Sequence, residues 1–270
     1  MTLIQRQMLP AFVPLETFTT RPRVLDVDDA VWLNRGGRHV PALARRCDAV
    51  ICGNEFLAGY FRQWNPSVTV IPTPVDTDLL RPPADAPLSR RLIGWTGTSE
   101  NYRFLYGIET ELAEVLRTNR DAALLVISDR PPRFSRIPDE QVEFVRWTPA
   151  AESEGLRRIC AGIMPLDDTE WSRGKCSFKM LCYMASGVPV VASPVGMNAH
   201  VLSHGDIGFG PRDSGAWVGA LSTLIQDTKA ATQMGANARA IAVEHFSVKA
   251  LGPVFADTLR SVAERRKSRN

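Results

Sequence analysis

Short runs in which nearly every residue is apolar recur along this chain, and longer stretches with helical spacing separate them. A strand that exposes one face to water alternates apolar and polar residues, whereas a parallel strand covered by helices on both faces is apolar throughout. The pattern therefore predicts an α/β fold with parallel sheets between layers of helices. The expected strands are 23–28, 48–53, 68–72, 91–97, 122–128, 142–147, 161–166 and 188–194.

Helical spacing of apolar residues predicts helices between these strands and three more after residue 212. The last of them has an apolar stripe, which must pack against another part of the protein. The stripe consists of Val248, Leu251, Phe255, Leu259 and Val262. The expected helices are 54–63, 99–117, 150–160, 175–186, 212–227, 228–245 and 247–264.

The stretch 72–90 contains five prolines and neither helical nor alternating spacing, which is typical of a connector between domains. We therefore predict a first domain over residues 1–76, a second over 77–246, and a C-terminal helix with a basic tail over 247–270. The first has about three strands, which is near the lower limit for an independent sheet. The second has roughly five or more and can bury a core of its own.

The charge balance is mild, with 32 basic residues against 29 acidic residues and a formal net charge of +3. Proteins that bind nucleic acid normally concentrate basic residues on one face, so we predict no nucleic-acid partner. The densest basic run is the terminal ERRKSRN, which we interpret as a solvated tail. Peripheral contact with an anionic membrane surface is the alternative.

The five cysteines include no C-x-x-C pair and no metal-ligand spacing, and their number is odd. This is typical of a reduced compartment, so we predict a cytoplasmic protein without a metal centre. The N-terminus is unlike a signal peptide because Arg6, Pro10 and Pro14 interrupt its apolar run. No window reaches the roughly 20 apolar residues of a membrane span.

Three cations, Arg173, Lys175 and Lys179, lie close together at the expected start of the helix 175–186. Lys175 and Lys179 are one helical turn apart, so we expect them on the same side, beside the N–H groups of the first turn. Cations there oppose the helix dipole unless an anion lies between them, which indicates a phosphate or diphosphate site. The alternative is that the three side chains are solvated or paired with Asp167, Asp168 and Glu170. The expected core face of this helix consists of Phe178, Leu181, Cys182 and Ala185.

A second stretch, IGWTGTSENYRFL, predicts a strand that runs into Gly97, with Thr98 or Ser99 as the cap of the next helix. Glycine in such a turn lets backbone amides approach an anion, and ligands gather at the carboxyl ends of strands in open α/β sheets. The turn contains neither G-x-G-x-x-G nor G-x-x-x-x-G-K-[ST]. This disfavours a dinucleotide-dependent dehydrogenase and a P-loop nucleotidase.

Together with the helical C-terminus, GWTGTSENYRFL and GIMPLDDTEWSRGKCSFKMLCYMASGVPVVASPVGMN resemble the GT-B glycosyltransferases of family four, the group 1 glycosyltransferases. The likeness is best over 91–210, and LIQRQMLP and VLDVDDAVW extend it over nearly the whole chain. It implies two Rossmann-like domains across a cleft: an acceptor-side N-terminal domain, here shortened and incomplete, and a C-terminal domain that holds a UDP- or GDP-sugar. It also implies that the last helix crosses back to the first domain, and that no metal or other cofactor is required.

The resemblance assigns roles at the donor diphosphate. The glycine turn at Gly97 and Thr98, with Ser99, would face the diphosphate, and Arg173 would bind it. Lys175 and Lys179 would be catalytic, because they neutralise the charge that develops on the leaving diphosphate.

Further roles concern the nucleoside and the acceptor. Trp147 and Thr148 would form the edge of the base pocket, and an ordinary core or surface aromatic is the alternative for Trp147. Asp28 or Asp29, at a strand end, would bind acceptor hydroxyls or act as a base, and helix capping is the alternative.

Two departures from the family pattern bear on function. The family often carries two glutamates eight positions apart around the lysine-bearing helix, the second of which holds the ribose hydroxyls, but here these positions are Gly174 and Cys182. A thiol is a poor substitute for a carboxylate acceptor, so either other groups hold the ribose or donor binding is weaker. The first strands of a full acceptor domain are also absent before LIQRQ. The acceptor pocket is therefore incomplete, supplied by another chain, or lost through truncation, and uncovered apolar surface favours a homodimer.

These observations lead to a hexosyltransferase-like enzyme as the first hypothesis. It moves a sugar from a nucleotide sugar to an unknown acceptor, which is a glycan, a lipid or a small molecule, with the retention of configuration that the family implies. The alternatives are a non-catalytic nucleotide-sugar-binding module or partner subunit, and a nucleotide-sugar epimerase.

Overall fold

The computed structural model describes residues 1–5, 18–34, 37–82 and 91–267, which form two compact units. Unit 1 comprises Met1–Pro74, Asp168–Cys176 and Val248–Asn270. Unit 2 comprises Val75–Asp167 and Ser177–Ser247. The short segment 168–176 lies within the predicted second domain along the sequence, but it packs with unit 1.

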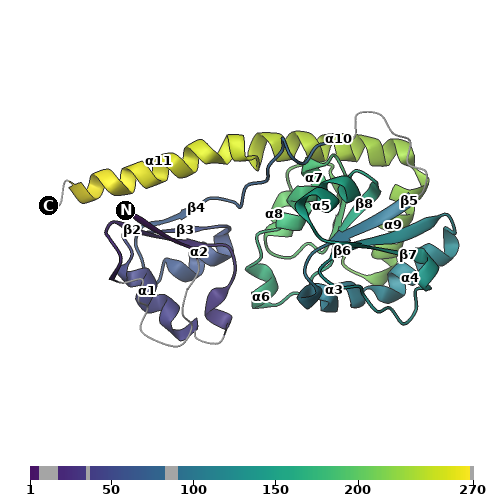
Figure 1. The fold of residues 1–270 in the computed structure, drawn as a ribbon, viewed down its shortest axis with the longest axis horizontal. Helices are drawn as coiled ribbons and strands as arrows, with labels where there is room; N and C mark the ends of the chain where they lie inside the picture. The colour runs from purple at the N-terminus through teal and green to yellow at the C-terminus, as the bar shows by residue number, and fades with distance from the viewer. Residues whose placement is uncertain (6–17, 35–36, 83–90, 268–270) are drawn as a thin grey trace. The chain divides into compact units, whose positions relative to one another are not determined.

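The elements of both units are shown in Figure 1. The strands are β1 Thr2–Gln5, β2 Arg23–Val27, β3 Ala49–Cys52, β4 Val68–Val70, β5 Arg91–Thr96, β6 Ala122–Ser128, β7 Val142–Arg146, β8 Ile159–Met164, β9 Val190–Ala192 and β10 Gly208–Phe209. The helices are α1 Val40–Arg46, α2 Glu55–Phe61, α3 Tyr102–Tyr106, α4 Glu109–Thr118, α5 Pro149–Leu156, α6 Glu170–Arg173, α7 Phe178–Ala185, α8 Met197–Leu202, α9 Ser214–Gln226, α10 Thr228–His245 and α11 Val248–Lys267. Short 3-10 helices cover Val31–Leu33, Gly37–His39, Ser99–Asn101 and Asp139–Gln141.

Unit 2 is built on a parallel sheet with the strand order β10-β9-β8-β5-β6-β7. This is the order of a Rossmann fold, in which the first strand lies at the centre and the chain winds outward in both directions. The winding direction reverses between β5 and β8. In such sheets ligands bind at the carboxyl ends of the strands beside this reversal.

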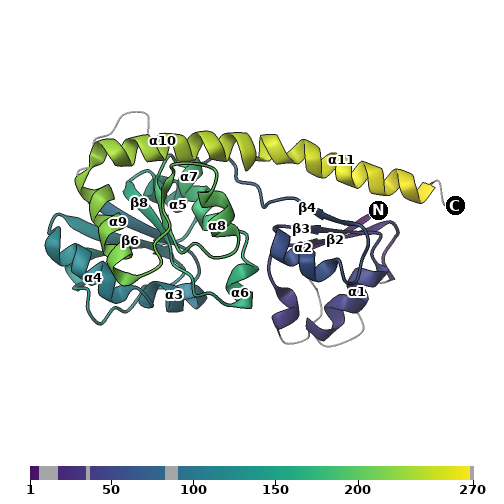
Figure 2. The same cartoon turned by 180° about the vertical axis from the view of Figure 1, so that it is seen from behind.

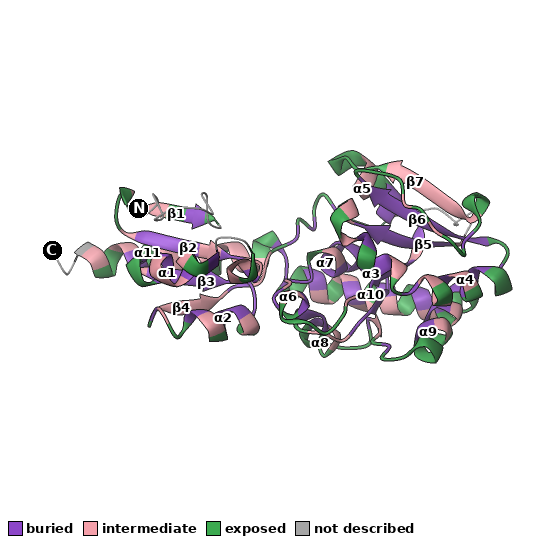
Figure 3. Ribbon diagram, turned by 90° about the horizontal axis from the view of Figure 1, so that it is seen from below, coloured by how far each residue is buried: buried purple, intermediate pink, exposed green. Residues whose placement is uncertain are grey.

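Strand β6 shows why the central strands of unit 2 are largely apolar. Ala123, Leu125 and Ile127 enter the core beneath α5, α7, α8 and α10. Their neighbours in the strand enter the core beneath α3, α4 and α9. Figures 1 and 2 show these helices on the two faces of the sheet, and Figure 3 shows β5 and β6 buried while β7 lies at the half-buried edge. Both faces exclude water, so β6 is apolar from Ala122 to Ile127, and its last residue, Ser128, is polar.

Unit 1 is built on the parallel sheet β1-β2-β3-β4. Helices α1 and α2 cover one face, where Leu25 and Val50 are buried. The long helix α11 covers the other face, where Val262 packs with Val24 and Ile51. Leu251, Phe255 and Leu259 pack against the same cluster, whereas Val248 is 50% exposed. The predicted return of the last helix to the first sheet is therefore confirmed.

The expected strands are all present, and the predicted α/β fold is confirmed. The sequence analysis missed β1 and β10, which have four and two residues. It also missed α1, α6 and α8. Unit 1 therefore has four strands among the residues described instead of about three.

The prediction for the start of the lysine-bearing helix is wrong. Helix α7 begins at Phe178, because Ser177 adopts a left-handed conformation with φ 56° and interrupts the helical path. Lys175 therefore lies before the helix and does not share a face with Lys179. Phe178 was expected in the core but is 48% exposed, whereas Leu181, Cys182 and Ala185 are buried.

The proline-rich connector is partly packed onto unit 2. Val75 and Leu80 belong to its core. Arg239 on α10 donates to the carbonyl groups of Thr77 and Leu80, at 2.8 Å and 2.7 Å. Residues 83–90 of the predicted connector lie outside the described part of the chain.

No helix among the described residues is both long enough and apolar enough to cross a bilayer.

The close approach of β8 and α7 depends on a glycine. A Cβ at Gly162 would lie 2.2 Å from the ring of Tyr183, which is fully buried. We expect Gly162→Ala to lower the free energy of unfolding by about 1–3 kcal/mol, because neither backbone nor ring has room to move. Urea denaturation measures the change. Gly219→Ala is the control: it lies on exposed helix surface with no atom within 4 Å of the added Cβ, and should be neutral or stabilise by up to about 1 kcal/mol. Equal effects at the two positions would contradict this packing.

Candidate functional site

The candidate site lies at the carboxyl end of β5, beside the reversal in strand order. Strand β5 ends at Thr96, and the main-chain N–H of Gly97 donates to the carbonyl of Ile127 at 3.1 Å. Gly97 has φ +153°, a conformation that residues with a side chain rarely adopt. The turn predicted from the sequence is therefore present at the position where this fold binds ligands.

The side chain of Lys179 lies directly against this glycine. A Cβ at Gly97 would be 2.3 Å from Cε and 2.8 Å from Nζ of Lys179, so a side chain at this position would displace the ammonium group. Nζ also lies 5.1 Å from the centroid of the Trp95 ring, within the range of a cation–π contact. The structure thus brings together Gly97 and Lys179, two residues that the sequence analysis selected separately.

The N-terminus of α7 is fixed by a buried polar network. Ser177 Oγ donates to Asn198 Oδ1 at 2.6 Å, and Asn198 Nδ2 donates to the carbonyl of Ser193 at 3.1 Å. The Ser177 side chain therefore makes no capping bond to the first turn of α7. This network fixes the positive end of the helix. The Ser177 hydroxyl does not accept from the N–H groups of the first turn.

Ser99 and Thr98 take part in the turn itself. The main-chain N–H and Oγ of Ser99 both donate to the Asp129 carboxylate, at 2.7 Å and 2.9 Å. These bonds hold the pKa of Asp129 below its ordinary value. Thr98 Oγ1 accepts from Asn101 Nδ2 at 2.9 Å. Ser99 thus fixes the turn after β5 through its bonds to Asp129.

Arg173 and Lys175 belong to the segment that packs with unit 1. Arg173 forms a two-point ion pair with Asp168, with N–O distances of 2.6 Å and 3.0 Å, which lowers the pKa of Asp168. This is the alternative that the sequence analysis left open for Arg173. Lys175 Nζ lies 5.2 Å from the centroid of the Trp171 ring. Both residues are described within unit 1, and Lys179 within unit 2.

The residues expected around the nucleoside differ in exposure. Trp147, directly after β7, is 47% exposed, and Thr148 caps α5 by accepting from the amide of Ala151 at 3.1 Å. Cys182 is 1% exposed and lies in the core, where burial raises its pKa. A neutral thiol is only a weak acceptor, so the buried Cys182 is a poor partner for ribose hydroxyls.

Glu152 is a site residue that the sequence analysis missed. Its Oε1 accepts from Thr96 Oγ1 at 2.6 Å, at the end of β5. Its charge raises the pKa of Cys182 while that of Lys179 lowers it, so both charged groups lie near this thiol. The sequence carries no signal for the contact, because Glu152 is 56 residues from Thr96 and is typical of the first turns of any helix.

The aspartates of the first half lie in unit 1. The main-chain carbonyl of Asp28 accepts from Cys176 Sγ at 3.0 Å, and that of Asp29 accepts from the amide of Val31 at 2.7 Å. Asp28 lines a cavity together with Asp26, whereas Asp29 does not. No group of three or more potential metal ligands is present within the described ranges.

The family is decided by a sequence match. The profile of the family described as glycosyl transferases group 1 matches residues 90–227, which is more than half of the chain. The chain belongs to the group 1 glycosyltransferases. None of the curated protein sequences matches it.

Solved structures agree on the fold of this group 1 glycosyltransferase. It is similar to sucrose-phosphate synthase from Thermosynechococcus elongatus, with a TM-score of 0.70 and 18% identity over 93% of this chain and 70% of that chain. It is also similar to Anabaena HepE in complex with UDP and glucose, with a TM-score of 0.71 and 19% identity over 89% of this chain and 72% of that one. WaaG, a glycosyltransferase involved in lipopolysaccharide biosynthesis, has a TM-score of 0.61 and 15% identity over 82% and 70% of the two chains. These similarities show the GT-B fold.

The bonds from Ser99 to Asp129 predict a pH-dependent contribution to stability. A carboxyl with a lowered pKa stabilises the fold above its ordinary value of 3.8, and this contribution is lost as the pH falls through the lowered pKa. Ser99→Ala removes the hydroxyl bond, so we expect the pKa of Asp129 to rise toward 3.8 in an NMR titration. The stability difference between the variant and the parent should be largest at neutral pH and shrink below about pH 4. A difference that is independent of pH would contradict this role.

Proposed function

We propose that unit 2 binds the diphosphate of a nucleotide sugar at Gly97 and Lys179, and that the protein transfers the sugar to an acceptor hydroxyl with retention of configuration. The observation that carries the proposal is the ammonium of Lys179 held against the main chain of Gly97, at the strand reversal of a Rossmann sheet. Membership in the group 1 glycosyltransferases supports the reaction class.

The chemistry favours this placement of charge. Breaking the bond between sugar and diphosphate leaves additional negative charge on the phosphate oxygens. A fixed ammonium group and the amides at a helix N-terminus stabilise that charge without having to reorganise. Lys179 is therefore the proposed catalytic residue, and Thr98 directly follows Gly97 in the turn. Roles for Lys175 and Arg173 at the diphosphate, and for Asp28 and Asp29 at the acceptor, remain predictions.

The nucleoside is proposed to lie between β7 and α5. Trp147 offers an exposed indole face for the base, and Thr148 follows it at the helix start. Because Cys182 is buried, we propose that Glu152 accepts the ribose hydroxyls in place of the carboxylate that the family often has at position 182. A carboxylate accepts several hydrogen bonds, so its bond from Thr96 leaves further capacity.

UDP is the first nucleotide to test, since HepE was solved with UDP and glucose. Lys179→Ala should weaken the binding of both UDP and inorganic pyrophosphate by about 10–100-fold, as expected for a lost charge-assisted hydrogen bond. Isothermal titration calorimetry measures both ligands. Lys229→Ala, on the exposed start of α10, removes the same charge elsewhere in unit 2 and should change neither affinity. Unchanged UDP binding in Lys179→Ala would refute the phosphate site.

Glu152→Gln tests the ribose contact separately. The amide keeps an acceptor for Thr96 but is a weaker acceptor for ribose hydroxyls, so UDP binding should weaken by about tenfold. Pyrophosphate has no ribose, so its binding should not weaken. Equal losses for UDP and pyrophosphate would assign Glu152 to the diphosphate instead.

Transfer itself is tested by incubating the protein with UDP-glucose and candidate acceptors while measuring UDP release. Release that depends on an acceptor supports the proposal. Binding without release would identify a nucleotide-sugar-binding module, and isomerisation of the sugar without an acceptor would identify an epimerase.

A further inference from the structure

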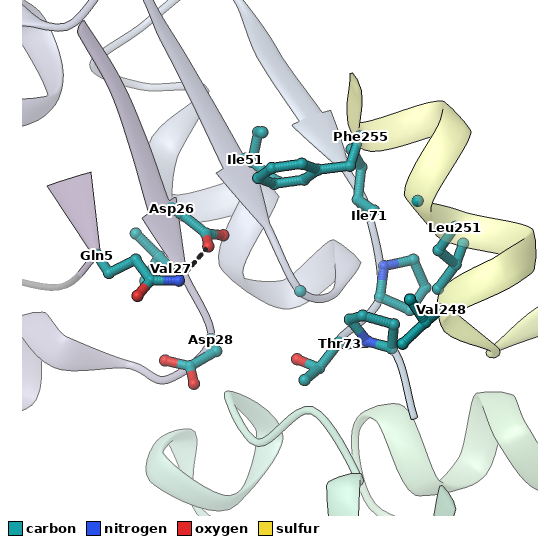
Figure 4. Close-up of a pocket in the computed structure, with 14 residues that line it drawn as sticks. Gln5, Asp26, Val27, Asp28, Ile51, Ile71, Thr73, Val248, Leu251 and Phe255 are labelled. Atoms are coloured by element: carbon teal, nitrogen blue, oxygen red, sulfur yellow. Dashed lines mark hydrogen bonds between the residues drawn. The ribbon is translucent and has the colours of Figure 1, made fainter. Parts of the chain in front are cut away.

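Unit 1 contains a cavity of about 630 Å³ at the carboxyl ends of β2, β3 and β4, next to α11. Figure 4 shows Gln5, Asp26 and Asp28 on one side of it and Val248, Leu251 and Phe255 on the other. Its volume is within the range of small-molecule sites in proteins. Every residue that lines this cavity belongs to unit 1, so the cavity is distinct from the proposed donor site of unit 2.

The polar wall is acidic. It consists of Gln5, Asp26 and Asp28 (Figure 4). Gln5 Nε2 donates to Asp26 Oδ2 at 3.4 Å, which orients that carboxylate along the wall (Figure 4). Among the described residues that line the cavity, none is basic. A ligand that donates hydrogen bonds is therefore favoured here, and a ligand with its own negative charge is repelled.

The apolar wall comes from the sheet and from the returning helix. Ile51 and Ile71 are buried in the sheet, and Leu251 and Phe255 are half-buried on α11. The Phe255 ring contributes both to the packing of α11 and to the cavity surface (Figure 4). A ligand that fills the cavity must therefore have an apolar part as well as a polar one.

Burial has an electrostatic consequence for Asp26. Removal from water raises its pKa, the hydrogen bond from Gln5 opposes this, and the charge of Asp28 raises it further. Burial therefore leaves the ionised Asp26 carboxylate with fewer hydrogen-bond donors than it has in open water. Hydroxyl groups of a ligand replace the missing water as donors, whereas a phosphate or carboxylate adds repulsion.

We propose that this cavity binds an uncharged, hydroxyl-bearing molecule with an apolar portion, whose hydroxyls donate to Asp26 and Asp28 and whose apolar portion packs against Phe255. The assignment of this molecule as the sugar acceptor rests on the proposed function, but the ligand preference of the cavity does not. The site selects against acceptors that carry a phosphate or carboxylate on the polar end.

The preference is tested on the full chain without a donor. Hexyl β-glucoside and hexyl β-glucuronide share ring and tail and differ by one carboxylate, and glucose lacks the tail. We expect hexyl β-glucoside to bind at least about tenfold more tightly than either of the others, as measured by calorimetry or saturation-transfer NMR. Equal binding of glucoside and glucuronide would overturn the proposal.

Variants test the contributions of the two walls separately. Asp26→Asn and Asp28→Asn should lower the ratio of the glucoside affinity to the glucuronide affinity. Phe255→Ala should weaken glucoside binding at least about fivefold while the ratio stays the same. Val254→Ala, on the exposed side of α11, is the matched control. It should change neither the glucoside affinity nor the ratio of the two affinities. A ratio that is unaffected by both asparagine variants would also overturn the proposal.

The stability of the Asp26→Asn variant provides a check on folding. Because the pKa of Asp26 is raised in the folded state, its ionisation costs stability above the ordinary value of 3.8. The asparagine variant should therefore be at least as stable as the parent at pH 7, and a loss of selectivity does not reflect unfolding. Failure of UDP to bind, with glucoside selectivity intact, would remove only the donor assignment. UDP release with an unselective cavity would remove only this inference.

Discussion

The contact between Lys179 and Gly97 is the constraint on which the proposed donor site of unit 2 depends. Lys179 lies in the first turn of α7, and its ammonium group occupies the space that a side chain at position 97 would need. The Trp95 ring lies within cation–π range of the ammonium group. The network from Ser177 to Asn198 fixes the start of α7. A small residue, a cation and a fixed helix end at the reversal of the strand order are the features that support the proposed anion site.

The segment 168–176 links this site to unit 1 through the chain itself. The Nδ2 group of Asn54 lies 3.1 Å and 3.2 Å from the carbonyl oxygens of Lys175 and Gly174, while its Oδ1 caps α2. Cys176 also donates to the carbonyl of Asp28. These bonds anchor the segment immediately before α7, and Ser177 then turns the chain into the helix of unit 2. The three cations Arg173, Lys175 and Lys179 are thus divided between the two structural units.

The two proposed sites have opposite electrostatic character. The site at Lys179 favours an anion, whereas the cavity of unit 1 is lined by Asp26 and Asp28 and by no basic residue among those described. A diphosphate is repelled by the cavity, and an uncharged hydroxylated molecule gains little at the cation. The difference in charge therefore supports our proposal that donor and acceptor bind to different units. Helix α11 contributes to this division, because it closes the sheet of unit 1 and provides the apolar wall of its cavity.

The sequence by itself determined the layered α/β fold, the turn at Gly97 and the apolar stripe of α11, because local periodicity and turn chemistry encode these features. It did not place Lys175, since the left-handed Ser177 is stabilised by Asn198, which is 21 residues away along the chain. It did not reveal Glu152, whose partner Thr96 is reached only when β5 and α5 pack together. It also singled out Asp28 and Asp29 equally, and only the folded sheet directs Asp28 into a cavity beside Asp26. Tertiary packing decided these points, because each depends on residues that are distant in sequence and that no local pattern connects.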